Sequence, residues 1–318
     1  MLTRRDMLFG TAATVAIAGC KSGGGLFGAA GKDPNLSVFL SDIHVAYGGI
    51  QTKWGPQPTY QNALFERTVD EILAMRPLPA RVVIFGDIAL WFGYRRDYET
   101  SLPLLKRLTA AGIDLYLTTG NHDHRLEMFE CHPRQAEITP VPGRFVSDID
   151  LGSCDLLLLD TLHETGQKEG DGNDVGGDLD DAQMAWLEKR VKTAARPFFC
   201  GGHHSPRDLN GRDVRTLLKK SPLFVGWIHG HDHKFSETWF SENYADGAHI
   251  RRIAVLPSTG WWGDIGYVTF RTCPDRAVLV LEEKDFFFPR PLKPGAARPA
   301  DWDLILAEHR GRSVTFTY

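Results

Sequence analysis

Several features that mark other protein classes are missing from this sequence. Its 318 residues carry 36 basic and 40 acidic side chains, a formal charge of −4, so no broad basic face for duplex nucleic acid is expected. Outside residues 21–32 the sequence has no low-complexity block, and it has no internal repeat. With 42% hydrophobic and 24% charged residues, the composition predicts one ordinary globular domain with a large core.

Cysteine is scarce, with five residues in all. Four of them, Cys131, Cys154, Cys200 and Cys273, allow three pairings, and their spacing resembles no compact disulfide framework. Cys154 and Cys200 lie in apolar, strand-like runs, which predicts buried thiols at these two positions.

The first 35 residues are set apart from the fold prediction. Thr3-Arg4-Arg5-Asp6-Met7-Leu8 resembles a twin-arginine motif, and Ile17-Ala18-Gly19-Cys20 resembles a lipobox. The apolar stretch between them is too short to span a bilayer. The alternative is a terminal helix with a coincidental arginine pair. We expect an export signal over residues 1–20, lipidation at Cys20, and a flexible glycine-rich tether over residues 21–35, which would leave an exported, membrane-anchored lipoprotein, periplasmic in location.

Short apolar runs alternate with helical patterns from Leu36 onward, which is typical of stacked β-α units. In the first half we expect strands at Leu36–Leu40, Arg81–Phe85 and Ile113–Thr118, and helices at Tyr60–Met75 and Asp97–Ala111. In the second half we expect strands at Cys154–Leu159, Phe198–Gly201 and Leu223–Ile228, and a helix at Asp181–Val191.

Further strand patterns at Phe235–Phe240, Ile250–Leu256, Gly266–Phe270 and Ala277–Leu281 indicate a second sheet packed on the first. The fold class is therefore predicted as α/β, an αββα sandwich of two mixed β-sheets flanked by helices. The catalytic domain is expected over residues 36–285, followed by a C-terminal strap or tail over residues 286–318. Within that tail, Arg312–Tyr318 is a candidate terminal strand.

Five short polar motifs follow apolar runs along the chain: Asp42-Ile43-His44, Gly86-Asp87, Gly120-Asn121-His122-Asp123, His203-His204 and Gly230-His231-Asp232-His233. Open α/β sheets place their sites at the carboxyl ends of neighbouring strands, so we expect these motifs to converge. Together they hold enough oxygen and imidazole ligands for two metal ions. Asp, Asn and His favour Fe, Mn, Zn or Co over Mg or Ca. This succession predicts a dinuclear metallohydrolase.

The spacing of the motifs suggests how they share the ions. Alternation along a strand predicts that Asp42 and His44 point to one side, and likewise His231 and His233. Asp87 could bridge two ions about 3.5 to 4 Å apart through its two oxygens, as two-metal hydrolysis requires. The alternative for Asp87 is a loop carboxylate that caps a turn.

The order of the five motifs resembles the calcineurin-like metallophosphoesterase superfamily over residues 36–285. Leu159-Asp160-Thr161 and the run from Gly177 to Leu187 are similar to the branch that includes class III cyclic nucleotide phosphodiesterases. The resemblance implies one ion held by Asp42, His44, Asp87 and His233, and a second held by Asp87, Asn121, His203 and His231.

The same resemblance implies the mechanism. A metal-bridging hydroxide would attack phosphorus in line. His122 would face the scissile phosphate, where it stabilises charge or protonates the leaving oxygen, with Asp123 orienting its ring.

The sequence departs from the family pattern at two places. Leu90 stands where the bridging motif usually ends in a polar residue, so the usual polar partner is missing. His203-His204-Ser205-Pro206 leaves two alignments of the fourth motif open, with His203 preferred over His204 as the ligand. Trp261 and Trp262 follow the last motif; they could stack on a planar leaving group or pack at a sheet edge.

The sequence therefore predicts a metal-dependent phosphoric ester hydrolase whose substrate is a phosphate ester, more specifically a phosphodiester. A phosphomonoesterase and an envelope lipid pyrophosphohydrolase are alternatives of the same reaction type. The non-enzyme alternative is a metal-binding envelope lipoprotein. His122 argues against that alternative, because metal binding alone does not require it. The oligomeric state is left open.

Overall fold

The computed structural model describes residues 31–48, 51–52, 55–56, 59–210, 213–239, 251–261, 263–287 and 311–318. The expected export signal with Cys20, the tether up to residue 30 and residues 288–310 of the expected strap lie outside this part of the chain. Among the described helices, none has the length and apolar character needed to cross a membrane.

The first sheet contains the strands that carry the first three motifs. Its order is β16 (Ser313–Thr317), β15 (Arg276–Phe287), β14 (Gly263–Cys273), β1 (Lys32–Leu40), β4 (Leu78–Phe85) and β5 (Asp114–Thr118). Strands β1, β4 and β5 are parallel, and helices α1 (Tyr60–Ala74) and α2 (Arg95–Ala110) form the connections between them. Strands β14, β15 and β16 continue the sheet by antiparallel pairing.

The second sheet carries the last two motifs. Its order is β12 (Ser236–Trp239), β13 (Arg252–Val255), β11 (Phe224–His229), β9 (Phe198–Gly202), β7 (Asp155–Leu158) and β6 (Ser147–Asp150). The four central strands are parallel, and β6 and β12 are antiparallel edges. Helices α5 (Asp181–Thr193) and α6 (Val214–Leu218) precede β9 and β11. The sequence patterns did not predict β6 or α6.

The remaining elements are short and lie in the connections. They are the two-residue strands β2 (Gln51–Thr52), β3 (Gly55–Pro56), β8 (Gly177–Asp178) and β10 (Leu209–Asn210), and the helices α3 (Arg125–Cys131) and α4 (Pro133–Ile138).

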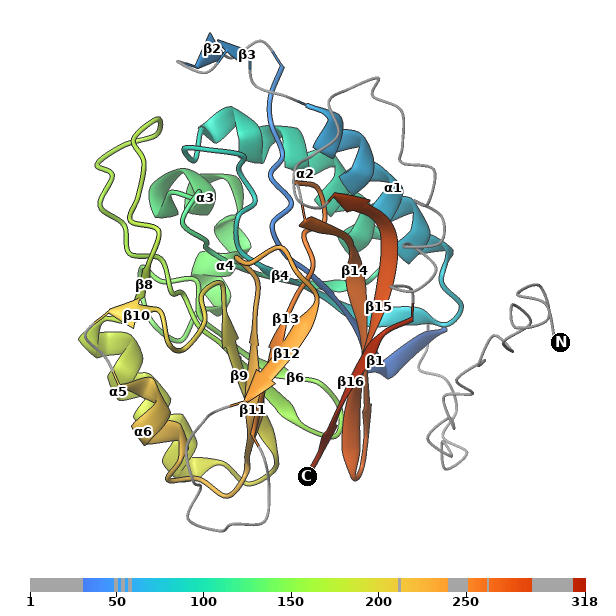
Figure 1. Ribbon diagram of the computed structural model, residues 1–318, viewed down its shortest axis with the longest axis vertical. Coiled ribbons are helices and arrows are strands. Elements are labelled where there is room, and N and C mark those ends of the chain that lie inside the picture. Colours follow the sequence, from blue (N-terminus) through green and yellow to red (C-terminus); the bar gives the residue numbers. More distant parts are fainter. Residues whose placement is uncertain are drawn as a thin grey trace, which may run out of the picture.

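Side chains that alternate along the buried strands divide the core into three apolar layers. Val38 and Leu40 pack with α1 and α2, whereas Phe39 between them packs into the layer between the two sheets. In the second sheet, Leu156 enters the layer between the sheets and Leu157 packs toward α5 and α6. Figure 1 shows α1 and α2 on one side of the strands and α5 and α6 on the other. The predicted αββα sandwich is confirmed, but the expected division of strands is wrong, because β14 and β15 extend the first sheet by antiparallel pairing and β7, β9 and β11 belong to the second.

The C-terminal residues belong to this fold. The predicted terminal strand is confirmed, because β16 pairs with β15. Phe316 on this strand is buried between the two sheets. The Tyr318 hydroxyl group lies 2.7 Å from the Cys273 carbonyl oxygen and 3.0 Å from that of Arg276. At the other end of the domain, β1 begins at Lys32, inside the segment for which a tether was expected.

Cys154 and Cys200 are buried and free, as predicted, and Cys131 is also a free thiol. Burial raises the pKa of the Cys154 thiol to about 12, so it is protonated at neutral pH. These thiols are packing groups rather than reactive ones.

Candidate metal centre

Five residues other than glycine have a positive φ in the described part of the chain, and all five are predicted metal ligands. They are Asp42 (52°), His44 (53°), Asp87 (51°), His231 (68°) and His233 (52°). Left-handed backbone is unfavourable for residues with a Cβ atom and costs on the order of 1–3 kcal/mol for each residue. Such strain persists where the surrounding structure enforces it, and it concentrates at functional sites.

The left-handed backbone also explains how the paired ligands meet. Strand β1 ends at Leu40 and β11 ends at His229, so both pairs lie in turns beyond their strands. Alternation along a strand therefore does not explain why the paired side chains lie together, because none of these residues is in a strand. The side chains of His44 and His233 nevertheless meet, with their Nε2 atoms 3.2 Å apart.

Two glycines allow the loops after β4 and β5 to touch. A Cβ atom on Gly86, which has a φ of +89°, would lie 2.6 Å from the Gly120 nitrogen. A Cβ atom on Gly120 would lie 2.2 Å from Asp87 Oδ1. Both distances are too short for real atoms, so the glycines of the second and third motifs are needed to bring Asp87 beside Asn121.

The first group of ligand atoms comes from both sheets and contains Asp42, His44, Asp87 and His233. Asp42 Oδ1 lies 3.0 Å from His233 Nε2 and 3.9 Å from His44 Nε2. His44 Nε2 also lies 3.8 Å from Asp87 Oδ2. Ligands about 2.0–2.2 Å from one ion are separated by distances of this size.

The second group is arranged around the Nε2 atom of His203. This atom lies 3.2 Å from each of Asp87 Oδ2, Asn121 Oδ1 and His231 Nδ1. Asp87 thus contacts histidines of both groups and lies between them. This is the position that a bridging carboxylate requires.

His204 lies beside the second group without the same contacts. Its Nδ1 atom is 2.8 Å from the Thr161 hydroxyl, and its buried Nε2 atom has no hydrogen-bond partner in the described structure. Its ring centroid is 4.8 Å from that of His203 and 4.9 Å from that of His231. The contacts with Asp87 and Asn121 favour His203 over His204 as the ligand.

The charges of the site fit cations. Asp42 and Asp87 are almost fully buried. Burial raises the pKa of Asp87, but His203 and His122 outweigh burial and hold it well below its usual range. Burial lowers the pKa of His203, but Asp87 and Asp42 outweigh burial and raise it to about 9. Two buried carboxylates therefore attract positive charge, which two metal ions would supply.

Main-chain carbonyl groups of β4 and the loop after it orient two of the imidazoles. His203 Nδ1 lies 2.8 Å from the Phe85 oxygen, and His44 Nδ1 lies 3.2 Å from the Leu90 oxygen. A carbonyl oxygen can only accept, so Nδ1 carries the hydrogen in both rings. In the neutral form of each ring, Nε2 then carries the lone pair that a metal ion would bind.

His122 lies at the open side of the site, with 25% of its side chain exposed. Its backbone nitrogen donates to Asp87 Oδ1 at 2.9 Å, and its ring Nδ1 donates to the Trp91 carbonyl oxygen at 2.9 Å. The Leu90 side chain has no polar atom that could bond the His122 ring. The Trp91 carbonyl oxygen serves as the partner of this ring instead. Nε2 lies 3.9 Å from Asp87 Oδ2 and is the ring atom available to a substrate.

Asp123 has a different role from the one expected. Its carboxylate accepts hydrogen bonds from the backbone nitrogens of Gly120, Ile88 and Ala89, at 2.9, 3.2 and 3.1 Å. It accepts a further bond from the Tyr98 hydroxyl at 3.2 Å. The prediction that Asp123 orients the His122 ring is wrong, because these bonds direct Asp123 to the loop backbone. Burial and the charge of Asp87 raise its pKa to about 6.

The residues that support the histidine pair lie in segments noted above only for their family resemblance, and no structural role was predicted for them. The Thr161 hydroxyl accepts from the backbone nitrogens of His203 and His204, at 3.1 and 3.2 Å, and bonds His204 Nδ1. Gln183 bonds both backbone groups of Asp160, at 3.1 and 2.9 Å. The Leu159-Asp160-Thr161 triplet after a strand was the available signal.

Asp160 anchors the same region through charge. Its fully buried carboxylate forms a two-bond ion pair with Arg125, at 2.8 Å for each bond. Arg125 also pairs with Glu164 at 2.9 Å. Burial raises the pKa of Asp160, but Arg125 outweighs burial and lowers it. The loop that carries Asn121 is thus tied to the end of β7.

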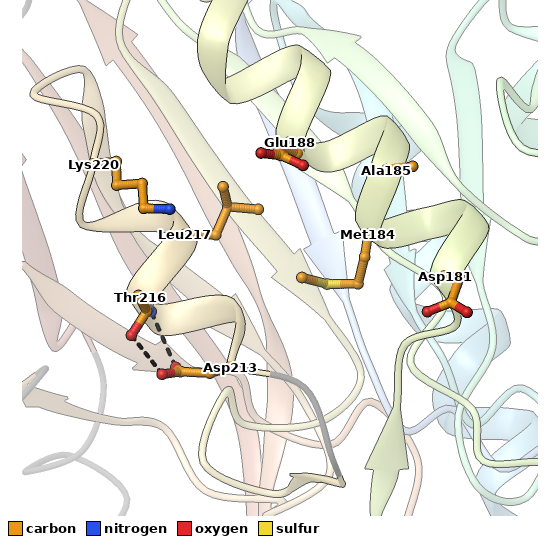
Figure 2. Close-up of a pocket in the computed structure, with 8 residues that line it drawn as sticks. All are labelled: Asp181, Met184, Ala185, Glu188, Asp213, Thr216, Leu217 and Lys220. Atoms are coloured by element: carbon orange, nitrogen blue, oxygen red, sulfur yellow. Dashed lines mark hydrogen bonds between the residues drawn. The ribbon is translucent and has the colours of Figure 1, made fainter.

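A hollow of about 440 Å³ lies between α5 and α6 and is separate from the metal centre (Figure 2). Met184, Ala185 and Leu217 form its apolar part, with Asp181, Glu188, Asp213 and Lys220 at its sides. Figure 2 shows Asp213 bonded to Thr216 at the start of α6, where it caps the helix. No predicted metal ligand lines this hollow.

Comparisons with known proteins assign the class. A model of the calcineurin-like phosphoesterase family matches residues 37–235, and the chain belongs to this family. The protein is accordingly a metal-dependent phosphoester hydrolase. A search of curated proteins found no match.

The chain is also similar to solved structures. A dimetal phosphatase from Danio rerio is 17% identical, with 90% of this chain and 100% of that chain covered and a TM-score of 0.61. A purple acid phosphatase from yellow lupin, Lupinus luteus, is 12% identical, with 88% and 53% covered and a TM-score of 0.49. At 17% identity the likeness to the Danio rerio structure concerns the fold alone.

The support given by Thr161 can be tested by Thr161→Val, which keeps the volume and removes the hydroxyl. We expect metal affinity to fall by roughly 10–100-fold, because the His203 backbone loses its anchor. Competition with a chelator measures this affinity. Thr272→Val is a matched control, since Thr272 is buried and bonds the Leu151 carbonyl oxygen away from the site. Equal affinities in the two variants would refute the role of Thr161.

Proposed function

We propose that the protein is a dinuclear metal-dependent phosphodiesterase. The observation that carries this proposal is the position of Asp87, which contacts histidines of two separate ligand groups. The strained backbone of the candidate ligands and the family membership support the same function.

The proposed ligand sets follow the two groups of contacts. One ion is held by Asp42, His44, Asp87 and His233, and the other by Asp87, Asn121, His203 and His231. Nitrogen and oxygen donors of this kind suit Fe, Mn, Zn or Co. When bound, the two ions supply positive charge that polarises the phosphoryl oxygens and makes the attacking water more acidic.

The chain itself supplies orientation and a proton. His122 is held by the Trp91 carbonyl through Nδ1, so its Nε2 atom faces the open side of the site. In the imidazolium form, Nε2–H donates to the leaving oxygen and stabilises the charge that develops there. Asp123 keeps the loop of His122 in place through its bonds to Gly120, Ile88 and Ala89.

The surroundings of His122 support a diester over a monoester. Trp91 lies with its ring centroid 5.8 Å from that of His122, and Trp261 lies next to Trp91. A monoester carries one more charged oxygen than a diester, and these aromatic side chains offer that oxygen no charge. Thr161 and Gln183 lie in the segments that resemble the class III cyclic nucleotide phosphodiesterase-like branch, and their bonds to the histidine loop and to Asp160 support membership of that branch.

A substrate panel separates this proposal from its alternatives. We expect kcat/KM for bis(p-nitrophenyl) phosphate to exceed that for p-nitrophenyl phosphate by about tenfold or more, because the site favours a neutral second substituent. Cyclic AMP and a lipid pyrophosphate complete the panel. A clear preference for the monoester or for the pyrophosphate would contradict the proposal, and no turnover of any substrate would favour a metal-binding lipoprotein.

The proposed role of His122 is tested by His122→Ala. We expect turnover to fall about 100-fold or more with metal content unchanged, because the ring donates a proton and does not bind a metal ion. Steady-state kinetics and elemental analysis give the two readouts. His122→Ala with full activity would remove the residue from the mechanism. Loss of metal would instead mean that it is a ligand.

We propose further that the protein is exported as a folded enzyme and anchored by lipid at Cys20, in agreement with the twin-arginine and lipobox patterns. Cys20→Ser should release the enzyme from the membrane fraction into the soluble periplasm, because a single cysteine carries the acyl chains. Fractionation followed by immunoblotting measures this change. An unchanged distribution would contradict lipid anchoring.

A further inference from the structure

Three aromatic side chains form a continuous wall beside the metal centre, which we call the aromatic wall: Trp91, Trp261 and Tyr60. Trp91 and Trp261 lie edge to face, with ring centroids 5.6 Å apart at 74°. Tyr60 stacks on Trp261, with centroids 5.9 Å apart at 16°. These separations are those of favourable aromatic pairs, so the three rings support one another.

The aromatic wall lies beside two histidine rings of the site. Trp91 lies 5.8 Å from the ring of His122, and Trp261 lies 6.2 Å from the ring of His44. One ring is the proposed proton donor and the other is a proposed metal ligand. A group attached to the phosphorus through its leaving oxygen would therefore lie against the wall.

The loop that carries Trp261 is fixed to the loop that carries Asp42. Ser258 Oγ donates to the Asp42 carbonyl oxygen at 2.9 Å and accepts from the Trp261 nitrogen at 2.8 Å. Thr259 N donates to the Ser41 oxygen at 2.8 Å. A Cβ atom on Gly260 would lie 2.2 Å from the Ile43 oxygen, so only glycine permits this approach. Trp261 is therefore preorganised relative to the site.

The wall is partly open to solvent, although it lies beside buried ligands. Trp91, Trp261 and Tyr60 are all half-buried, unlike the fully buried rings of the core such as Phe39. The Tyr60 hydroxyl is buried and has no hydrogen-bond partner in the described structure, so stacking on Trp261 positions this ring. The wall thus presents flat, uncharged surface beside two cation sites.

We infer that the aromatic wall is the subsite for the leaving group, and that it selects phosphate esters whose leaving group is a planar aromatic ring. The inference rests on the proposed function and deepens it by naming the substrate class. A planar ring makes contact over its whole face with an indole, whereas a puckered ring or a branched alkyl group touches it at few atoms.

Binding of two phosphonates of equal size tests the inference without turnover. Phenylphosphonate is planar at the ring and cyclohexylphosphonate is puckered, and calorimetry on the metal-loaded protein measures both affinities. We expect phenylphosphonate to bind about tenfold more tightly, since stacking on an aromatic side chain contributes an effect of that order. Equal affinities, or no binding of either ligand, would overturn the inference.

Variants of Trp261 assign the preference to the wall. Trp261→Ala should abolish most of the phenyl preference, and Trp261→Phe should retain most of it, because a smaller ring still stacks. Ile138→Ala is the matched control, since Ile138 is exposed at the end of α4 and should leave the preference unchanged. A full preference in Trp261→Ala would overturn the inference, and so would its loss in Trp261→Phe with correct folding by circular dichroism.

Kinetics distinguish failure of the inference from failure of the proposed function. Methyl phenyl phosphate and methyl hexafluoroisopropyl phosphate have leaving groups of similar acidity, so they differ mainly in shape. We expect the ratio of their kcat/KM values to favour phenyl and to fall about tenfold in Trp261→Ala, chiefly through KM. An unchanged ratio would overturn the inference. Preferential binding of phenylphosphonate without hydrolysis of either ester would contradict the proposed function and would still support the inference.

Discussion

Two carboxylates buried among imidazoles are the constraint on which the rest of the site depends. Asp42 and Asp87 lie out of solvent, and imidazole nitrogens lie 3.0 to 4.0 Å from their carboxylate oxygens. Buried negative charge of this kind is costly unless cations neutralise it. The left-handed turns at both residues are the backbone cost of placing them there.

The sandwich fold makes this arrangement possible by joining the ends of two sheets. The loops after the parallel strands β1, β4 and β5 supply Asp42, His44, Asp87 and Asn121, and the loops after β9 and β11 of the second sheet supply His203, His231 and His233. Each group of ligands therefore contains residues from both sheets, and neither sheet alone completes a group. The core layer between the sheets, with Phe39 and Phe270 stacked at 4.8 Å, therefore also holds the two halves of the site in register.

Sequence periodicity was enough to predict the main strands, the sandwich and the motifs that converge, because apolar alternation and motif order depend on local sequence. It could not predict that Asp123 bonds the backbone of Gly120, or that the Trp91 carbonyl holds His122, because main-chain partners leave no residue-specific signal. Strand alternation failed for Asp42 and His44, since their positive φ values depend on contacts between distant loops.

Metal content tests the central claim most directly, through the carboxylate shared by the two groups. The purified protein should contain two metal ions per chain, and Asp87→Ala should retain at most one. Asp148→Ala, which removes an exposed carboxylate paired with Arg190, should retain both and serves as the control. Elemental analysis of the three proteins measures the number of metal ions per chain. An Asp87→Ala protein that still holds two ions would contradict a centre built around this side chain.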